Sequence, residues 1–158
     1  MSDLSIVVDA SVWISWLRPS ETNHKASSIW MEQFITKNGF LVSPAMLLIE
    51  VAASISRLTG QALRAKEAIT RLNSISRIQI SPMDSSLVQL AIDAATNLQL
   101  RAGDAIYVAL AHQLNIPLIS WDKEQIQKAS SLVTTYTPEN YIFPDDSINE
   151  ETQYQPEQ

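Results

Sequence analysis

Four acidic side chains occupy stretches of sequence in which a carboxylate is out of place. Asp9 ends the apolar run LSIVVD, Glu50 lies within PAMLLIEVAAS, Asp104 lies within AGDAIYVALA, and Asp122 follows IPLISW. An unpaired buried carboxylate is unfavourable by several kcal/mol unless a cation or hydrogen bonds compensate it. Each of these acids therefore needs a partner, and the nature of that partner decides the chemistry.

Glu50 is the most informative of the four. The positions around it are apolar or small on every side of the expected helix, and a helix that is hydrophobic all round is buried. One explanation is an ion pair with Arg18 or Arg57, since pairing is the usual way to bury a charge. The other is that Glu50 faces further acids around a bound cation.

The three aspartates have ordinary explanations when each is taken singly. Asp9 and Asp104 could be N-caps, and Asp122 precedes Gln125 by the spacing of a capping box. A shared acidic pocket explains all four acids at once, because like charges close together require bound cations or protons. Ligands that are all carboxylates select Mg²⁺ or Mn²⁺ rather than zinc.

Apolar runs separated by helical patterns predict how the acids meet. The expected strands are 4–9, 40–43, 77–81, 116–120 and 132–136, and the expected helices are 10–17, 21–37, 44–58, 61–75, 84–98, 103–114 and 122–129. This alternation predicts an α/β fold, a three-layer α/β/α sandwich around a parallel sheet of about five strands. Ligands of open parallel sheets bind at the carboxyl ends of the strands, where Asp9 and Asp122 are expected.

Composition narrows the classes of function. The 158 residues are the length of one domain and include no cysteine, which excludes disulfides, thiolate zinc sites and cysteine nucleophiles. No basic signal segment begins the chain, and no apolar run approaches the ~18 residues of a membrane span, so we expect a cytoplasmic protein without a membrane anchor. Residues 144–158 are acidic and polar, and we expect a disordered tail behind a folded domain of residues 1–143.

The net charge of −6 hides a basic segment. Residues 57–77 contain Glu67 as their one acid and five cations, which are Arg57, Arg64, Lys66, Arg71 and Arg77. The segment either follows a phosphate backbone or is a solvated helix face. Arg57 and Arg101, the latter close to Asp104 in sequence, are the candidates for contacts with a phosphate backbone.

Aromatic and histidine residues are expected to have packing roles. Trp13 and Trp16 lie three apart on one helix, where a core or dimer-interface role is more common than stacking on bases. His24 and His112 lie in helices far apart in sequence and are expected to be packing or surface residues.

Together these segments resemble the motifs of the PIN-domain family of metal-dependent nucleases. VVDASVW resembles the first motif, PAMLLIEVAASISR the second, and LRAGDAIYVALAHQLNIPLISWD the third and fourth, over residues 6–136. A compact chain of this length is similar to the ribonuclease toxins of VapBC-type toxin–antitoxin pairs. The resemblance implies RNA cleavage dependent on Mg²⁺ or Mn²⁺, a homodimer, and inhibition by an antitoxin protein.

Carried over motif by motif, the resemblance assigns metal binding and catalysis to the four acids, Asp9, Glu50, Asp104 and Asp122. Asp9 and Asp104 are expected to contact the metal directly, while the other two bind a second ion or order water. Ser11 and Ser120 each lie two residues from an aspartate and are expected to orient it by hydrogen bonds. Trp121 departs from the family pattern because it is bulkier than the residue expected there, and the acidic tail has no counterpart.

Other functions remain open at this point. A catalytically silent PIN-like binding module keeps the pocket without the reaction, and a free-standing RNA-processing nuclease has no antitoxin. A receiver-like phosphoacceptor requires paired acids after the first strand, whereas Asp9 stands alone. A phosphatase with an Asp-x-Asp nucleophile fails for the same reason, because Ala10 and Ser11 follow Asp9.

Overall fold

The computed structural model of the chain describes residues 4–144. Its strands are β1 (Ser5–Val8), β2 (Phe40–Pro44), β3 (Ile78–Ser81), β4 (Leu118–Ile119) and β5 (Thr135–Tyr136). They form one sheet in the order β3-β2-β1-β4-β5, and every neighbouring pair is parallel. The predicted five-stranded parallel sheet is confirmed. The predicted acidic tail lies outside the described residues except for Pro144.

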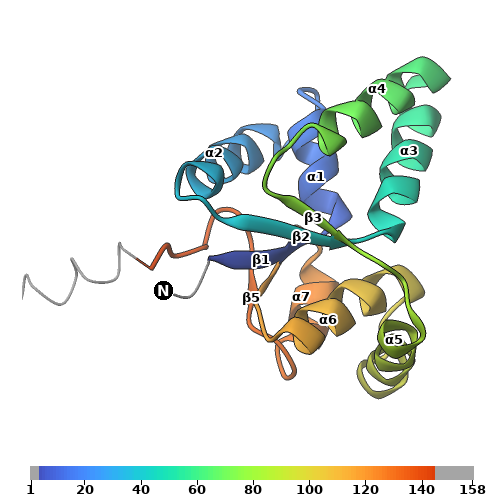
Figure 1. Cartoon of the computed structure of the whole chain (residues 1–158), viewed down its shortest axis with the longest axis vertical. Helices are drawn as coiled ribbons and strands as arrows, with labels where there is room; N and C mark the ends of the chain where they lie inside the picture. The colour runs from blue at the N-terminus through green and yellow to red at the C-terminus, as the bar shows by residue number, and fades with distance from the viewer. Residues whose placement is uncertain (1–3, 145–158) are drawn as a thin grey trace, which may run out of the picture.

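Seven helices connect and flank the strands in the described part of the chain. They are α1 (Ala10–Leu17), α2 (His24–Thr36), α3 (Met46–Thr59), α4 (Ala62–Asn73), α5 (Ser85–Leu98), α6 (Ala102–Leu114) and α7 (Lys123–Ala129). Helices α1 to α4 cover one face of the sheet and α5 to α7 the other, which gives the predicted three layers (Figure 1). None of the helices in residues 4–144 is long and apolar enough to cross a bilayer.

The central strand β1 explains why the layers stack as they do. Ile6, Val7 and Val8 are completely buried, as a strand without polar alternation predicts when helices cover both faces. Trp13 is also completely buried, and its indole Nε1 donates to Ser43 Oγ at 3.0 Å. The prediction of a packing role for Trp13 is therefore confirmed.

The largest differences from the predicted boundaries are at the start of α2 and in the last two strands. Helix α2 begins at His24 instead of residue 21, because Arg18 and Glu21 form successive turns whose carbonyls accept from Glu21 N–H and His24 N–H. Strands β4 and β5 have two residues each, shorter than the apolar runs that contain them. Neither difference moves an acid to another edge of the sheet.

The chain reverses its direction across the sheet between β1 and β4. From β1 it proceeds to β2 and β3 on one side, and it then crosses to β4 and β5 on the other. In open parallel sheets the crevice at such a switch point, outside the carboxyl ends of the strands, is where ligands bind. The residues that follow β1 and β4 are therefore the place to look for a site.

Candidate active site

Two of the four acids lie at this switch point and begin helices. Asp9 follows β1 and is the N-cap of α1, while Asp122 follows β4 and is the N-cap of α7. Strands β1 and β4 are parallel neighbours, so both aspartates lie at the same edge of the sheet. Oδ1 of Asp122 accepts from the backbone N–H groups of Glu124 at 3.0 Å and Gln125 at 3.1 Å. The structural explanation for these two aspartates, as caps, is confirmed.

Asp9 also has contacts that capping does not require. Only 6% of its surface is exposed. Its Oδ2 accepts from Ser11 N–H at 3.0 Å and from Ser120 Oγ at 3.3 Å, and its Oδ1 accepts from Gln125 Nε2 at 3.3 Å. Burial raises the pKa of Asp9 above its usual range although these hydrogen bonds oppose the shift. The carboxylate is thus held in one orientation at the bottom of the site.

The two serines form an ordered chain of hydrogen bonds with the acids. Ser11 Oγ accepts from Trp121 N–H, and Ser120 Oγ accepts from Asp122 N–H, both at 3.0 Å. The single hydroxyl proton of Ser120 points to Asp9, so the Ser11 hydroxyl must donate to Ser120 Oγ, 3.3 Å away. Both serines predicted to support the acids therefore contact them or each other.

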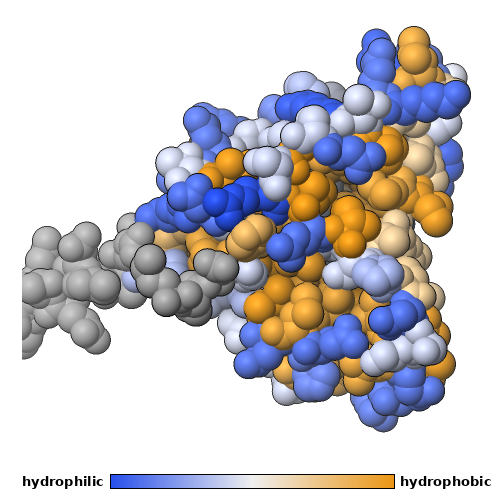
Figure 2. All heavy atoms as spheres, in the orientation of Figure 1, coloured by the Kyte–Doolittle hydropathy of each residue, from blue (hydrophilic) through white to orange (hydrophobic). Residues whose placement is uncertain are grey.

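Glu50 on α3 is half-buried, and the prediction that its helix is buried on every side is wrong. Ile49, the preceding residue, is 72% exposed, because one face of α3 is not covered by another element of the described chain. Apolar atoms reach the surface over both helical layers (Figure 2). Because α3 is only partly covered, Glu50 keeps some contact with solvent, which reduces the desolvation of its carboxylate.

No arginine in residues 4–144 neutralises Glu50. Arg18 pairs with Glu21 instead, and Glu50 Oε1 accepts from the hydroxyl of Tyr107 at 2.9 Å. Burial raises the pKa of Glu50, and the negative charges of Asp9 and Asp104 raise it further. Glu50 is therefore a member of the acidic group and has no compensating cation among the described residues.

Asp104 lies in the first turn of α6, but it does not cap that helix. The N-cap is Arg101, so the alternative explanation of Asp104 as an N-cap is wrong, and α6 begins one residue before Gly103. Burial is the largest cause that raises the pKa of Asp104 to about 6, followed by the charges of Asp9 and Asp122. The positive charge of Arg101 opposes this shift.

The amino end of α6 also meets Glu50. A Cβ built on Gly103 would lie 3.9 Å from Glu50 Oε2. The amino ends of α1 and α7 are already at this edge, and the dipole of each helix favours a carboxylate at its amino end. Three helix amino ends thus lower the repulsion that the four acids would otherwise experience, and the acids act on one another electrostatically as one group.

The donor set fits a hard cation, since every candidate ligand is a carboxylate oxygen. Within residues 4–144, however, no three His, Asp or Glu side chains are arranged as the ligands of one metal ion. Protein donors occupy both oxygens of Asp9, and Tyr107 occupies Oε1 of Glu50. Glu50 Oε2, Asp122 Oδ2 and the Asp104 carboxylate accept none of these side-chain hydrogen bonds. The assignment of the four acids as metal ligands stays a prediction.

The two candidate RNA contacts lie differently with respect to the acids. Arg101 is exposed at the start of α6, and its charge acts directly on Asp104. Arg57 is exposed on α3 seven residues after Glu50, which places it on the same helix face ~10 Å farther along the axis. Arg101 is therefore close to Asp104 in sequence and also acts on it electrostatically. The contacts of Arg57 and Arg101 with RNA stay predictions.

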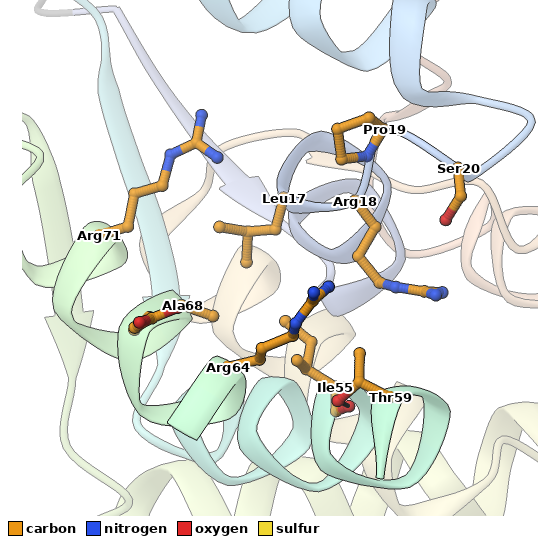
Figure 3. A pocket seen from close by; sticks show the side chains of 10 residues that line it. Leu17, Arg18, Pro19, Ser20, Ile55, Thr59, Arg64, Ala68 and Arg71 are labelled. Atoms are coloured by element: carbon orange, nitrogen blue, oxygen red, sulfur yellow. Dashed lines mark hydrogen bonds between the residues drawn. The ribbon is translucent and has the colours of Figure 1, made fainter. Parts of the chain in front are cut away.

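Two cations of the basic segment, Arg64 and Arg71, face a different hollow. A cavity of about 440 Å³ lies between the end of α1 and the α3–α4 pair, and the side chains of Arg18, Arg64 and Arg71 surround it (Figure 3). The guanidinium of Arg71 also stacks on the Trp16 ring, 4.2 Å from its centroid. None of the four acids lines this cavity. These cations therefore do not extend the acidic site.

The histidines take the structural roles that were expected. The Nδ1 of His24 donates to the carbonyl of Ser15 at 2.9 Å, which ties the start of α2 to α1. His112 is exposed in the last turn of α6, at the opposite end of that helix from Asp104. Neither side chain belongs to the acidic group.

Two residues of the site escaped prediction. Tyr107 has a sequence signal, because it lies three residues after Asp104 on one helix face and carries a hydroxyl within an apolar stretch. Gln125 was expected to complete a capping box with Asp122, but its side chain bonds instead to Asp9 and to the Asp104 carbonyl. Its contact partners are distant in sequence, so local spacing carries no signal for that role.

The stability of the metal-free protein is expected to fall as pH rises from about 5 to about 7.5. The folded-state pKa values of Asp9, Glu50 and Asp104 are raised, so the folded protein binds protons that the unfolded chain has released. These bound protons stabilise the fold fully when the pH is below the pKa of the carboxyls in the unfolded chain, about 4. The stabilisation is lost as the pH rises through the folded-state pKa, which is about 6 for Asp104.

Urea denaturation in the presence of a chelator measures this dependence. Asp104→Asn should reduce the slope between the two pH values, while Asp93→Asn, an exposed change on α5, should leave it unchanged. A wild-type stability that stays level or increases over this interval would contradict the electrostatic coupling of the acids.

Comparisons with known proteins agree with this architecture. A chain of VapBC2 from Rickettsia felis, solved bound to a promoter DNA fragment, has a TM-score of 0.66 at 11% identity, with 85% of this chain and 98% of that chain covered. VapC20 of Mycobacterium tuberculosis, described as a sarcin–ricin loop cleaving toxin, has a TM-score of 0.66 at 17% identity, with coverage of 81% and 96%. FitAcB of Neisseria gonorrhoeae has a TM-score of 0.64 at 19% identity, with coverage of 86% and 99%.

At these identities the structural likeness shows a shared fold. A search of curated protein sequences finds no significant match. The family model of the PIN domain matches residues 6–130, which include all four acids, both serines, most of β1 and all of β2 to β4. The chain belongs to the PIN domain family.

Proposed function

We propose that this protein is a divalent-metal-dependent endoribonuclease that acts in the cytoplasm as the toxin of a toxin–antitoxin pair. The observation that carries the proposal is the acidic group at the switch point of the sheet. The charges of Asp9 and Asp104 raise the pKa of Glu50, those of Asp9 and Asp122 raise the pKa of Asp104, and Glu50 has no compensating cation in residues 4–144. Membership of the PIN family supports a nuclease, and the toxin–antitoxin proteins among its structural neighbours support the biological role. An antitoxin partner and a homodimer belong to the same proposal.

Asp9 and Asp104 would hold Mg²⁺ or Mn²⁺, with Glu50 and Asp122 as ligands of a second ion or as residues that order water. The metal would make a water molecule nucleophilic at neutral pH and would neutralise charge on the leaving oxygen of the phosphodiester. Tyr107 holds one oxygen of Glu50 and leaves Oε2 directed to the amino end of α6. Arg101 is placed to attract a phosphate group beside Asp104.

A catalytically silent binding module is the second candidate. The observation that favours it is the state of the carboxylates, because protein donors already occupy both oxygens of Asp9 and no set of three ligands in residues 4–144 is arranged for a metal. In that case the four acids would serve helix capping and packing. A free-standing processing nuclease differs from a toxin only in its partner, so a short neighbouring gene that encodes a DNA-binding antitoxin discriminates between them.

Removal of divalent metal is expected to abolish RNA cleavage by the purified protein. The test incubates structured RNA with the full chain in Mg²⁺, then in excess chelator, then after addition of Mn²⁺ above the chelator concentration. Cleavage should be lost in the second reaction and return in the third, because the carboxylates supply no nucleophile of their own. Undiminished cleavage in excess chelator would contradict the proposal.

The control is Asp104→Asn purified in the same way, which measures any contaminating nuclease. If wild-type protein leaves RNA intact in every reaction, the result favours the silent binding module. Absence of Mn²⁺ binding in the same protein would then assign the four acids to helix capping and packing.

A further inference from the structure

Gln125 is a polar residue in a place where an apolar one would be expected to pack. It lies in the short helix α7, and none of its surface is exposed. Its Nε2 donates to Asp9 Oδ1 at 3.3 Å and to the backbone carbonyl of Asp104 at 3.4 Å. Because burying an amide is unfavourable unless its hydrogen bonds are made, the contacts of this side chain need an explanation.

Gln125 connects three of the segments that carry the acids. Its side chain reaches Asp9 after β1 and Asp104 in α6, and its backbone N–H donates to Asp122 Oδ1 at 3.1 Å. Gln125 lies 116 positions from Asp9 in sequence. It is therefore a direct link between segments that are distant in the chain.

The chemistry of its partners fixes the orientation of the amide. Both Asp9 Oδ1 and the Asp104 carbonyl are acceptors, so the NH₂ group must face them, since the reverse orientation would oppose oxygen to oxygen. Oε1 of Gln125 is then left buried without a hydrogen-bond partner in residues 4–144. A side chain selected only for stability would not leave such an acceptor unpaired, so the bonds made by Nε2 are what this residue contributes.

We propose that Gln125 is a positioning residue of the acidic site. It holds the Asp9 carboxylate in a fixed position relative to the amino end of α6, so that Asp9 and Asp104 present oxygens toward the same cation. This inference rests on the proposed metal-dependent function and adds to it a residue that contacts a ligand without being one. Residues that orient metal ligands in this way commonly change metal affinity or activity by about 10- to 100-fold when removed.

The test compares Gln125→Met with Gln127→Met in the full chain. Methionine keeps the length of the side chain and removes the amide, while Gln127 is exposed on the same helix and provides a matched control. Mn²⁺ binding is measured by the electron paramagnetic resonance of the free ion. Gln125→Met should weaken Mn²⁺ binding by about 10- to 100-fold, and Gln127→Met should bind as wild type does.

A kinetic readout separates positioning from general structure. The Mn²⁺ concentration for half-maximal cleavage should rise in Gln125→Met by the same factor as the dissociation constant, while the KM for RNA stays unchanged. Wild-type Mn²⁺ affinity in a folded Gln125→Met protein overturns the inference and leaves the proposed function intact. Absence of Mn²⁺ binding by the wild type itself overturns both.

Gln125→Asn keeps the test decisive if the methionine variant does not fold. Asparagine retains a buried amide but is one methylene shorter, so its NH₂ group falls short of Asp9 from the same backbone position. Weakened Mn²⁺ binding in this variant supports the inference. A lower melting temperature without any change in Mn²⁺ affinity assigns Gln125 a structural role and overturns it.

Discussion

Asp9→Asn is expected to reduce RNA cleavage by about 100-fold or more while the protein stays folded. Loss of a group that stabilises charge in the transition state typically has an effect of this size. The fold should persist because asparagine is as good an N-cap as aspartate, and the amide oxygen of the new side chain can still accept from Ser11 N–H. Removing a buried charge also relieves the desolvation that raises the pKa of Asp9.

Two measurements complete this prediction. Mn²⁺ should raise the melting temperature of the wild type by binding to the folded state alone, and this increase should be lost in Asp9→Asn. Asp93→Asn on the exposed face of α5 changes the same charge away from the site and should keep both cleavage and the increase. Retention of wild-type cleavage by Asp9→Asn would remove Asp9 from the catalytic group.

Trp13→Ala is expected to lower the free energy of unfolding by about 3–5 kcal/mol, a large share of the stability of an ordinary domain. Trp13 is completely buried, and its indole N–H donates to Ser43 Oγ, which in turn donates to the Val8 carbonyl at 2.6 Å. The substitution leaves a cavity beside the carboxyl end of β1, directly before Asp9. Urea denaturation followed by circular dichroism measures the loss.

Trp13→Phe separates the packing of the ring from its hydrogen bond. Phenylalanine keeps most of the apolar volume but removes the N–H, so the expected loss is smaller, about 1–3 kcal/mol. Trp16→Phe is the comparison on the same helix, because the Trp16 ring is only partly buried and packs under Arg71. Equal effects of Trp13→Phe and Trp16→Phe would show that α1 is not anchored through Trp13.

The fold was largely predictable because its signals are local. The run that forms β1 lacks polar alternation, which is the pattern of a strand covered on both faces, and Ile6, Val7 and Val8 are buried as expected. Gly60 ends α3 with a φ of +67°, a conformation that glycine adopts without strain, and Asp84 caps α5 through Leu87 N–H. These features depend on neighbours in sequence, so the pattern was sufficient.

Burial of α3 was mispredicted because it is not a local property. The residues around Glu50 are apolar on all sides, but whether each side is covered depends on where other helices pack, and Ile49 stays 72% exposed. The same limit applies to the start of α2. Its first three predicted residues are compatible with a helix. The carbonyls of Arg18 and Glu21 instead accept hydrogen bonds in two successive turns, and the helix begins at His24.

The candidate site was also predicted only in part, for the same reason. Asp9, Asp104 and Asp122 could be placed together from strand order, since each lies at or follows a predicted strand end or helix start. The hydrogen bond from Tyr107 to Glu50 and the contacts of Gln125 join residues far apart in sequence, and no spacing rule indicates them. Sequence patterns therefore identified acids that influence one another electrostatically, but not the neutral side chains that hold them.

The central claim is that the acids after β1 and at the start of α6 share one cation. Anomalous diffraction from a crystal soaked in Mn²⁺ and recorded at the manganese absorption edge tests it most directly. The account predicts an anomalous peak in contact with the carboxylates of Asp9 and Asp104, absent from an Asp9→Asn crystal treated in the same way. A map at saturating Mn²⁺ with no peak between these two carboxylates would contradict it.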